Sequence, residues 1–300
     1  MTKLNVLVSL ITNDNDYQEE QAAAAESAAR RLDAHIQIVY AGNDAVNQSQ
    51  QLLSVIQNSS QRPDAILVEP VGTGMPQVAG AAVAAGIGWA VVNREVDYVA
   101  KLRGNSGVPV FAVTTDQEEV GKIQGRQFAV FLKGGGTVLY IEGPSISEVA
   151  RLRTSGMHST KSQDVSTKVL KGDWTESSGY RAVKSWLSLS TSQQLHVRVV
   201  GCQNDAMAIG ARRAFEEVAE SHARKDWLSL PFTGCDGVAK TGLEWVRRGL
   251  LAATVITPPT MSLAFEIMTE AIRSGVQPPL RTLSLPTSYP APEEIAAKSS

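Results

Sequence analysis

Short apolar runs alternate with longer amphipathic segments along the whole chain. The apolar runs have the length and β-branched content of buried strands, whereas the amphipathic segments repeat apolar residues at helical spacing. This alternation predicts parallel sheets with right-handed crossovers and helices on both faces. In the first part of the chain the predicted strands are 4–11, 35–41, 65–69 and 89–93, and the predicted helices are 17–32, 45–57 and 75–85.

The second part of the chain repeats the alternation with a start of its own. Its predicted strands are 111–115, 137–142, 168–171, 197–202, 230–235 and 251–256, and its predicted helices are 118–132, one from about 148, 177–188, 206–218, 243–248 and 261–274. Segment 278–292 is rich in proline and is predicted to be extended. The predicted fold class is therefore α/β, with two doubly wound parallel-sheet lobes.

Composition removes several classes of protein. The chain has 300 residues, of which 43% are hydrophobic, and its formal net charge is -2. This excludes a disordered chain and leaves no global positive field for nucleic acid. The two cysteines, Cys202 and Cys235, are too few for a disulfide framework or a thiolate metal cluster, and are expected to be buried in strands.

The N-terminal sequence bears on the compartment. It has no basic start followed by an apolar run and a small-residue cleavage site, so we expect a cytoplasmic protein from the sequence as written. A periplasmic or extracellular location is expected if the sequence is a trimmed mature form. The apolar runs are too short to span a membrane, so membrane insertion is not expected.

Polar residues follow most of the predicted strands. In an open parallel sheet ligands bind beyond the carboxyl ends of the strands, so these positions are the candidate site. Carboxylates, amides and arginines bind vicinal hydroxyls, and an aromatic face packs against the C–H face of a sugar ring. The residues concerned are Asp14, Tyr17, Glu69, Asn93, Arg94, Glu142, Asp173, Trp174, Gln203, Asn204, Asp205 and Asp236.

Each of these residues alone has a simpler interpretation. Asp116, Asn204 and Asp205 follow strands and can cap the next helices. Arg94 and Arg153 can form surface ion pairs, and the two aromatic residues can serve packing alone. The combination of polar and aromatic residues at strand ends in both halves favours a cleft between two domains.

No catalytic motif accompanies this set. The four histidines lack metal-ligand spacing, and the chain has no nucleophile elbow and no phosphate-binding Walker loop. We therefore predict a protein that is not an enzyme, with no catalytic residue, no metal and no cofactor.

Several segments together resemble the type I periplasmic binding proteins of the ribose-type sugar-binding family, whose fold is shared with the ligand domain of lactose-repressor-like regulators. The similarity covers nearly the whole chain, and its most specific parts are the Asn-Asp-x-Met-Ala-x-Gly and Gly-x-Asp-Gly runs. The matching segments are 64–70 (DAILVEP), 85–94 (AGIGWAVVNR), 116–125, 149–156 (VARLRTSG), 204–214 (NDAMAIGARRA), 234–237 (GCDG) and 251–255 (LAATV).

The resemblance implies two lobes joined by three hinge crossings, with a ligand held between them and closure on binding. The N-terminal lobe is expected at residues 1–114 plus 258–285, and the C-terminal lobe at 115–257 plus 286–300. The family's motifs imply that Asn93 and Arg94 contact sugar hydroxyls from the first lobe. Arg153, Asn204 and Asp236 would do so from the second.

Other positions follow or depart from the family pattern. Tyr17 and Trp174 fall where the family has ring-stacking aromatics, one on each lobe. The carboxylate common after the fourth strand is replaced by Asn93, and we expect Glu69 to take over its role at the ligand. Thr257 stands where these proteins often carry glutamine, and Asp14 lies in a loop that is usually Asn-Pro-aromatic-aromatic.

The resemblance therefore implies a solute-binding protein that closes around a small polyhydroxylated ligand, expected to be a monosaccharide, for an ABC sugar transporter or a receptor. The expected partners are this ligand and a membrane transporter or sensor protein, with no direct nucleic-acid contact. The alternative is a cytosolic ligand sensor of lactose-repressor type without a DNA-binding headpiece. Asp14, Asp16, Glu69 and Asp236 also leave a cationic ligand open.

Overall fold

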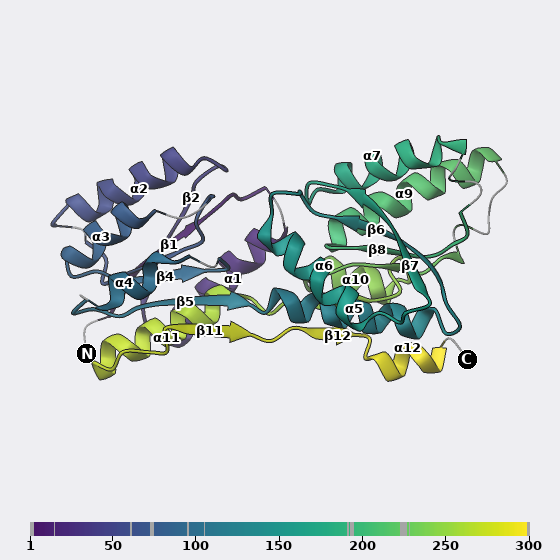
Figure 1. The fold of residues 1–300 in the computed structure, drawn as a ribbon. Coiled ribbons are helices and arrows are strands. Elements are labelled where there is room, and N and C mark those ends of the chain that lie inside the picture. Colours follow the sequence, from purple (N-terminus) through teal and green to yellow (C-terminus); the bar gives the residue numbers. More distant parts are fainter. Residues whose placement is uncertain are drawn as a thin grey trace. The chain divides into compact units, whose positions relative to one another are not determined.

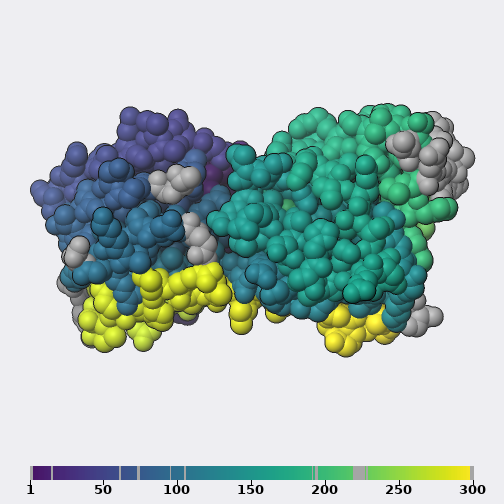
Figure 2. Space-filling model, viewed as in Figure 1, coloured from purple at the N-terminus to yellow at the C-terminus, as the bar shows by residue number. Residues whose placement is uncertain are grey.

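The chain crosses three times between two α/β units, after Thr115, Pro258 and Ser284. The structure is a computed structural model that describes residues 3–14, 16–60, 62–72, 75–94, 96–104, 106–190, 192, 195–222, 227 and 229–298. The first unit comprises Met1–Thr115 and Pro259–Ser284, and the second comprises Asp116–Pro258 and Leu285–Ser300. Each unit therefore combines a long continuous part of the chain with a short segment from near the C-terminus, as the colours of Figure 2 show.

The first unit is built on a six-stranded parallel sheet with the order β11-β5-β4-β3-β1-β2 (Figure 1). Its elements are β1 (Asn5–Leu10), α1 (Asp16–Arg31), β2 (His35–Tyr40), α2 (Ala45–Gln57), β3 (Ala65–Val68), α3 (Pro76–Ala84), β4 (Gly88–Val92), α4 (Tyr98–Gly104), β5 (Val110–Thr115), α11 (Thr260–Ser274) and β11 (Arg281–Ser284). The order reverses beside β1, which is where ligands bind in doubly wound sheets.

Alternation along the strands divides the core of this unit between two faces. Val6 and Val8 of β1 pack with the small residues of α1 and with Phe265 of α11. Leu7 points the other way and packs with Leu52 of α2 among residues of α3 and α4. Both faces of the sheet are covered, so its central strands β3 and β4 are apolar and buried throughout, as expected for a parallel sheet.

The second unit has a parallel sheet with the order β7-β6-β8-β9 and a separate antiparallel pair, β10-β12. Its elements are α5 (Gln117–Phe131), β6 (Gly136–Glu142), α6 (Glu148–Thr160), β7 (Val165–Lys171), α7 (Glu176–Leu187), β8 (Val197–Cys202), α9 (Asp205–His222), β9 (Phe232–Thr233), α10 (Gly242–Arg247), β10 (Thr254–Ile256), β12 (Thr287–Tyr289) and α12 (Pro292–Lys298). Helices α5 and α6 cover one face of the sheet, and α7 and α9 cover the other (Figure 1).

The predicted α/β class with parallel sheets in two lobes is confirmed. Four details differ from the prediction. Strand β7 begins at Val165, three residues before the predicted start. The polar residues in its first half hid this part of the strand, because they interrupt the apolar run. Strand β9 is only two residues long, and its last residue, Thr233, forms an isolated bridge with Ala253. The short helices α4 and α12 were not predicted, because neither spans enough turns to show a period.

Both cysteines are buried and free. Cys202 ends β8, as predicted, whereas Cys235 lies two residues beyond β9 and not in a strand. Burial raises the pKa of both thiols well above the ordinary value. Within the described part of the chain, none of the helices combines the length and the apolar character that crossing a bilayer requires.

Candidate functional site

In the first unit, the predicted residues gather at the carboxyl edge of the sheet. Glu69 directly follows β3, and Asn93 and Arg94 directly follow β4, which is the neighbouring strand. Asp14 is exposed in the loop after β1, and Tyr17 lies in the first turn of α1. The three strands β1, β3 and β4 are adjacent in the sheet, so the predicted residues share one edge.

Glu69 is the buried centre of this group. Its side chain is only 2% exposed, and its two carboxylate oxygens accept hydrogen bonds from different side-chain amides. Gln18 Nε2 donates to Oε2 at 2.8 Å, and Asn93 Nδ2 donates to Oε1 at 2.9 Å. Burial raises the pKa of Glu69, while these hydrogen bonds and the nearby Arg94 charge act in the opposite direction.

A second buried glutamine fixes the strand end that carries Glu69. Gln48 Nε2 donates to Ser9 Oγ at 3.0 Å and to the backbone oxygen of Glu69 at 2.9 Å, and Gln48 Oε1 accepts from the Val71 amide at 2.8 Å. These bonds satisfy the backbone where the sheet ladder stops. Gln48 therefore holds the backbone around Glu69 in a fixed position at the end of β3.

Two atoms of the predicted residues remain unsatisfied. Asn93 Oδ1 and Arg94 Nε are buried and have no hydrogen-bond partner among the described residues. Buried polar atoms nearly always have a partner, so such exceptions indicate a missing water or ligand. The first unit therefore offers one acceptor and one donor on adjacent residues.

In the second unit, the site is organised around Arg153 on α6. Its side chain is buried, so the alternative of a surface ion pair is wrong for this residue. Arg153 Nε donates to Gln117 Oε1 at 2.8 Å, and Nη1 donates to the backbone oxygen of Gln203. The Asp236 carboxylate lies 3.6 Å from Nη1 and balances the charge.

Close packing of α5 against α6 sets the position of Arg153. A Cβ atom on Gly121 would lie 2.0 Å from the backbone oxygen of Arg153, and one on Gly156 would lie 2.0 Å from the backbone oxygen of Glu118. Only glycine permits this approach of the two helices. Segment 149–156 therefore contributes both a glycine for the close packing of the two helices and the Arg153 side chain.

Trp174 lies over this arginine. The Arg153 guanidinium carbon is 5.8 Å from the centre of the indole, a cation–π distance. On another side, a Cβ atom on Gly143 would lie 2.2 Å from the indole atom Cζ2, so the ring rests on the glycine backbone. Asn204 Nδ2 donates to the backbone oxygen of Trp174 at 2.8 Å. The orientation of the indole is therefore determined by three neighbours.

Asn204 also caps a helix, because its Oδ1 accepts from the Met207 amide at 2.9 Å at the start of α9. Next to it, Asp205 accepts from the Gly237 amide at 2.8 Å and from Thr254 Oγ1 at 2.7 Å, joining the ends of β8 and β10. Thr257 Oγ1 donates to the backbone oxygen of Asp236 at 3.3 Å. Asn204 thus caps α9, as the simpler interpretation proposed, and it also lies close after the end of β8.

Backbone conformation sets three of the predicted residues apart. Among the described residues, five that are not glycine have positive φ, and these include Asn93 at 60°, Trp174 at 73° and Asp236 at 104°. Asparagine and aspartate tolerate this region, but it is strained for a bulky side chain such as tryptophan. Strain of this kind clusters at functional sites, where the surrounding structure maintains it.

The sequence interpretation missed the buried glutamines that support these residues. Gln18, Gln48 and Gln117 are all buried near the amino ends of helices, where their amides reach strand ends or Arg153. The signal was a polar residue on the otherwise apolar face of a predicted helix. Such a residue in a buried position requires a partner.

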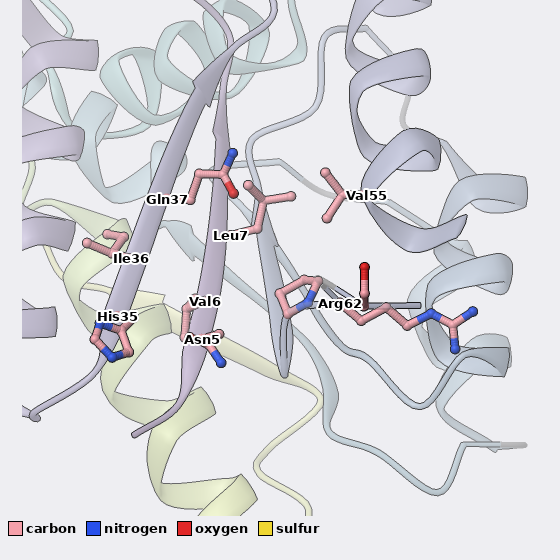
Figure 3. A pocket seen from close by; sticks show the side chains of 10 residues that line it. Asn5, Val6, Leu7, His35, Ile36, Gln37, Val55 and Arg62 are labelled. Atoms are coloured by element: carbon pink, nitrogen blue, oxygen red, sulfur yellow. The ribbon is translucent and has the colours of Figure 1, made fainter. Parts of the chain in front are cut away.

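A concave pocket of about 360 Å³ lies elsewhere on the first unit. It is lined by residues at the amino ends of β1 and β2, including Asn5 and His35, and by Val55 and Arg62 (Figure 3). This is the opposite edge of the sheet from Glu69 and Asn93. The pocket therefore contributes nothing to the predicted site.

Comparison with protein families gives a match to the periplasmic binding protein domain over residues 6–274. The chain belongs to this family. A protein of Rhizobium meliloti described as rhizopine-binding is 29% identical over 203 residues, which cover 65% of this chain and 62% of that protein. A xylitol-binding protein of Mycolicibacterium smegmatis is 29% identical over 237 residues, covering 77% of this chain and 61% of that protein. The matches thus span less than two thirds of the length of these curated relatives.

Among solved structures, a periplasmic solute-binding protein of an ABC transporter from Actinobacillus succinogenes, with bound D-allose, superposes with a TM-score of 0.82. It is 19% identical and covers 98% of this chain and 100% of its own, which establishes the shared fold. The resemblance to periplasmic binding proteins is thus confirmed. The matched family, both curated relatives and this solved structure are all described as binding proteins.

Proposed function

We propose that this chain is a solute-binding protein for a neutral monosaccharide or polyol, delivered to an ABC transporter. The observation that carries the proposal is the unsatisfied pair at the end of β4, Asn93 Oδ1 and Arg94 Nε. A buried acceptor next to a buried donor matches a hydroxyl group, which both donates and accepts.

The residues proposed to form the ligand site in the first unit are Asp14, Tyr17, Glu69, Asn93 and Arg94. Those proposed for the second unit are Arg153, Trp174, Asn204, Asp236 and Thr257. Positive φ at Asn93, Trp174 and Asp236 supports this assignment. The stacked arginine and indole also support it, because a fixed aromatic face suits the apolar side of a sugar ring.

Relatives support the class of ligand. The names of the two curated relatives give xylitol and rhizopine, and the solved structure contains D-allose. Family membership also supports delivery to a membrane transporter and a periplasmic location, both of which stay part of the proposal. The regulator alternative finds no such support among these relatives.

The test is calorimetric titration of the purified chain with xylitol, D-allose and myo-inositol. We expect at least one of them to bind with a dissociation constant on the order of micromolar, equivalent to about -8 kcal/mol. A chain that binds none of a wider panel of pentoses, hexoses and sugar alcohols is not a sugar-binding protein.

A matched pair of variants locates the binding. Asn93→Gly keeps the positive φ but removes the amide, and should weaken binding at least tenfold. Asp33→Gly is the control, because Asp33 also has positive φ, at 50°, but precedes β2 at the opposite edge of the sheet. Equal affinity of the two variants would remove Asn93 from the site.

A further inference from the structure

The amide of Asn93 has two chemically different ends, and the group it presents to a ligand depends on which end faces the protein. In the structure, Nδ2 faces Glu69 and Oδ1 is left without a partner among the described residues. A carboxylate can only accept hydrogen bonds. Turning the amide around would bring Oδ1 against the Glu69 carboxylate, so this carboxylate holds the amide in one orientation.

The orientation of Glu69 is itself determined by the protein. Gln18 Oε1 accepts from the Ile11 backbone amide at 3.1 Å, so its Nε2 must point to Glu69 Oε2. The other carboxylate oxygen remains for Asn93. Burial raises the pKa of Glu69, and the two amide donors and the Arg94 guanidinium act against it because they favour the ionised carboxylate.

We propose that Glu69 is a positioning residue that fixes the Asn93 amide, so that the first unit selects a neutral hydroxyl rather than an ammonium group. This inference rests on the proposed function. A hydroxyl can donate to Asn93 Oδ1 and accept from Arg94 Nε, whereas an ammonium only donates and is repelled by the arginine. Glu69 then acts on the ligand through Asn93.

The charges of both units support a neutral ligand. Glu69 is surrounded by two amide donors and Arg94, and Asp236 lies 3.6 Å from Arg153 Nη1. Each of these carboxylates therefore already has a compensating donor or cation. Of the other two acidic residues that left a cationic ligand open, Asp14 is exposed, where water screens its charge, and Asp16 is in the first turn of α1, where the helix N-terminus compensates its charge.

The first experiment needs no ligand. Neutron diffraction from the deuterium-exchanged, unliganded protein shows which end of the Asn93 amide carries deuterium. We expect two deuterons on the atom that faces Glu69. Deuterium on the opposite end of the amide overturns the proposal.

The second experiment exchanges the carboxylate and amide groups of positions 69 and 93 and measures affinity for xylitol and D-allose. In Glu69→Gln the introduced amide can donate to Asn93 Oδ1 and turn the Asn93 amide around. We expect a loss of affinity of about tenfold or more, which corresponds to ~1.4 kcal/mol. The double variant Glu69→Gln with Asn93→Asp restores an acceptor toward the ligand, since the introduced carboxylate accepts on both sides. Its affinity should return to within about threefold of the wild type.

Several outcomes separate the possible failures. Wild-type affinity in Glu69→Gln, or a double variant as weak as the single one, overturns the positioning role. A wild-type protein that binds D-glucosamine more tightly than D-glucose overturns hydroxyl selection. If the wild type binds neither xylitol nor D-allose nor any other sugar, the proposed function fails, and the neutron experiment alone decides the orientation of Asn93. Thermal melting of each variant identifies one that has not folded.

Discussion

In the first unit, two adjacent residues after β4 have buried polar atoms without a partner among the described residues, whereas in the second unit the buried Arg153 on α6 already has three partners. Asn93 Oδ1 and Arg94 Nε have no partner among the described residues. Arg153, by contrast, reaches Gln117, Gln203 and Asp236 and lies under an indole ring.

This difference suggests a division of roles. Open hydrogen-bonding atoms discriminate between chemical groups, because a wrong group leaves them buried and unpaired. An arginine held by several partners and a fixed indole present a surface of constant shape instead. We therefore expect substitutions in the first unit to change specificity, and substitutions in the second unit to change stability together with affinity.

The largest effect is expected for Arg153→Ala. Removing the guanidinium leaves Asp236 and the Gln117 side chain without their buried partner, which should destabilise the protein by about 3 kcal/mol and weaken sugar binding at least tenfold. Urea denaturation measures the stability. Arg151→Ala is the control on the same helix, because its ion pair with Glu148 is exposed and worth at most ~1 kcal/mol. Equal stability of the two variants would contradict the central role of Arg153.

A somewhat smaller effect is expected for Gly143→Ala. The new methyl group would meet the Trp174 ring, displace it and destabilise the protein by about 2 kcal/mol, with loss of affinity. Gly80→Ala is the control, since nothing lies within 4 Å of a Cβ atom at that helical position. This control should be neutral or slightly stabilising. Thermal melting and calorimetric titration distinguish the two variants, and an unchanged Gly143→Ala would show that the indole does not rest on this backbone.

Replacing Trp174 separates the ring from its backbone strain. Trp174→Ala and Trp174→Phe both keep a side chain at positive φ, but only the second keeps an aromatic face. We expect roughly tenfold weaker sugar binding for alanine and a partial recovery for phenylalanine. If both bind as the wild type does, the indole serves packing alone.

The smallest effect concerns pH. Burial raises the pKa of Glu69 in the folded protein above its ordinary value of 4.5, so the folded state holds this proton more tightly than the unfolded state. The resulting stabilisation is present below pH 4.5 and is lost as the pH rises through the folded-state pKa. The wild type should therefore lose stability relative to Glu69→Gln as the pH is raised from 4 to 7. A constant difference in melting temperature over this range would contradict the raised pKa.

Short apolar runs predicted most of the strands. Both sheets are covered on two faces, so most strands are apolar on both sides. Only the second half of the edge strand β7 was predicted, because its outward residues face solvent and are polar. The positions after the strands also predicted where the polar side chains lie together, and Glu69, Asn93 and Arg94 do share one edge of the sheet.

The roles of these residues were harder to predict. A role of Glu69 at the ligand stays a prediction, and nothing in the sequence pointed to the two side-chain amides that donate to its oxygens. Those partners, Gln18 and Asn93, are distant from it in the sequence and converge only through the parallel sheet. Which end of an amide faces a ligand depends on such tertiary contacts, and no local pattern encodes it.

The return of the chain to the first unit has a consequence for the order in which the protein forms during synthesis. Helix α11 supplies Met261, Phe265 and Met268 to the core that β1 and α1 begin. A ribosome that has made residues 1–115 has therefore released a sheet with one face incompletely covered. Most of the second unit, which is continuous from Asp116 to Pro258, emerges before α11 does. The later-made half of the protein can thus reach its folded state first, against the usual sequence of N-terminal before C-terminal folding.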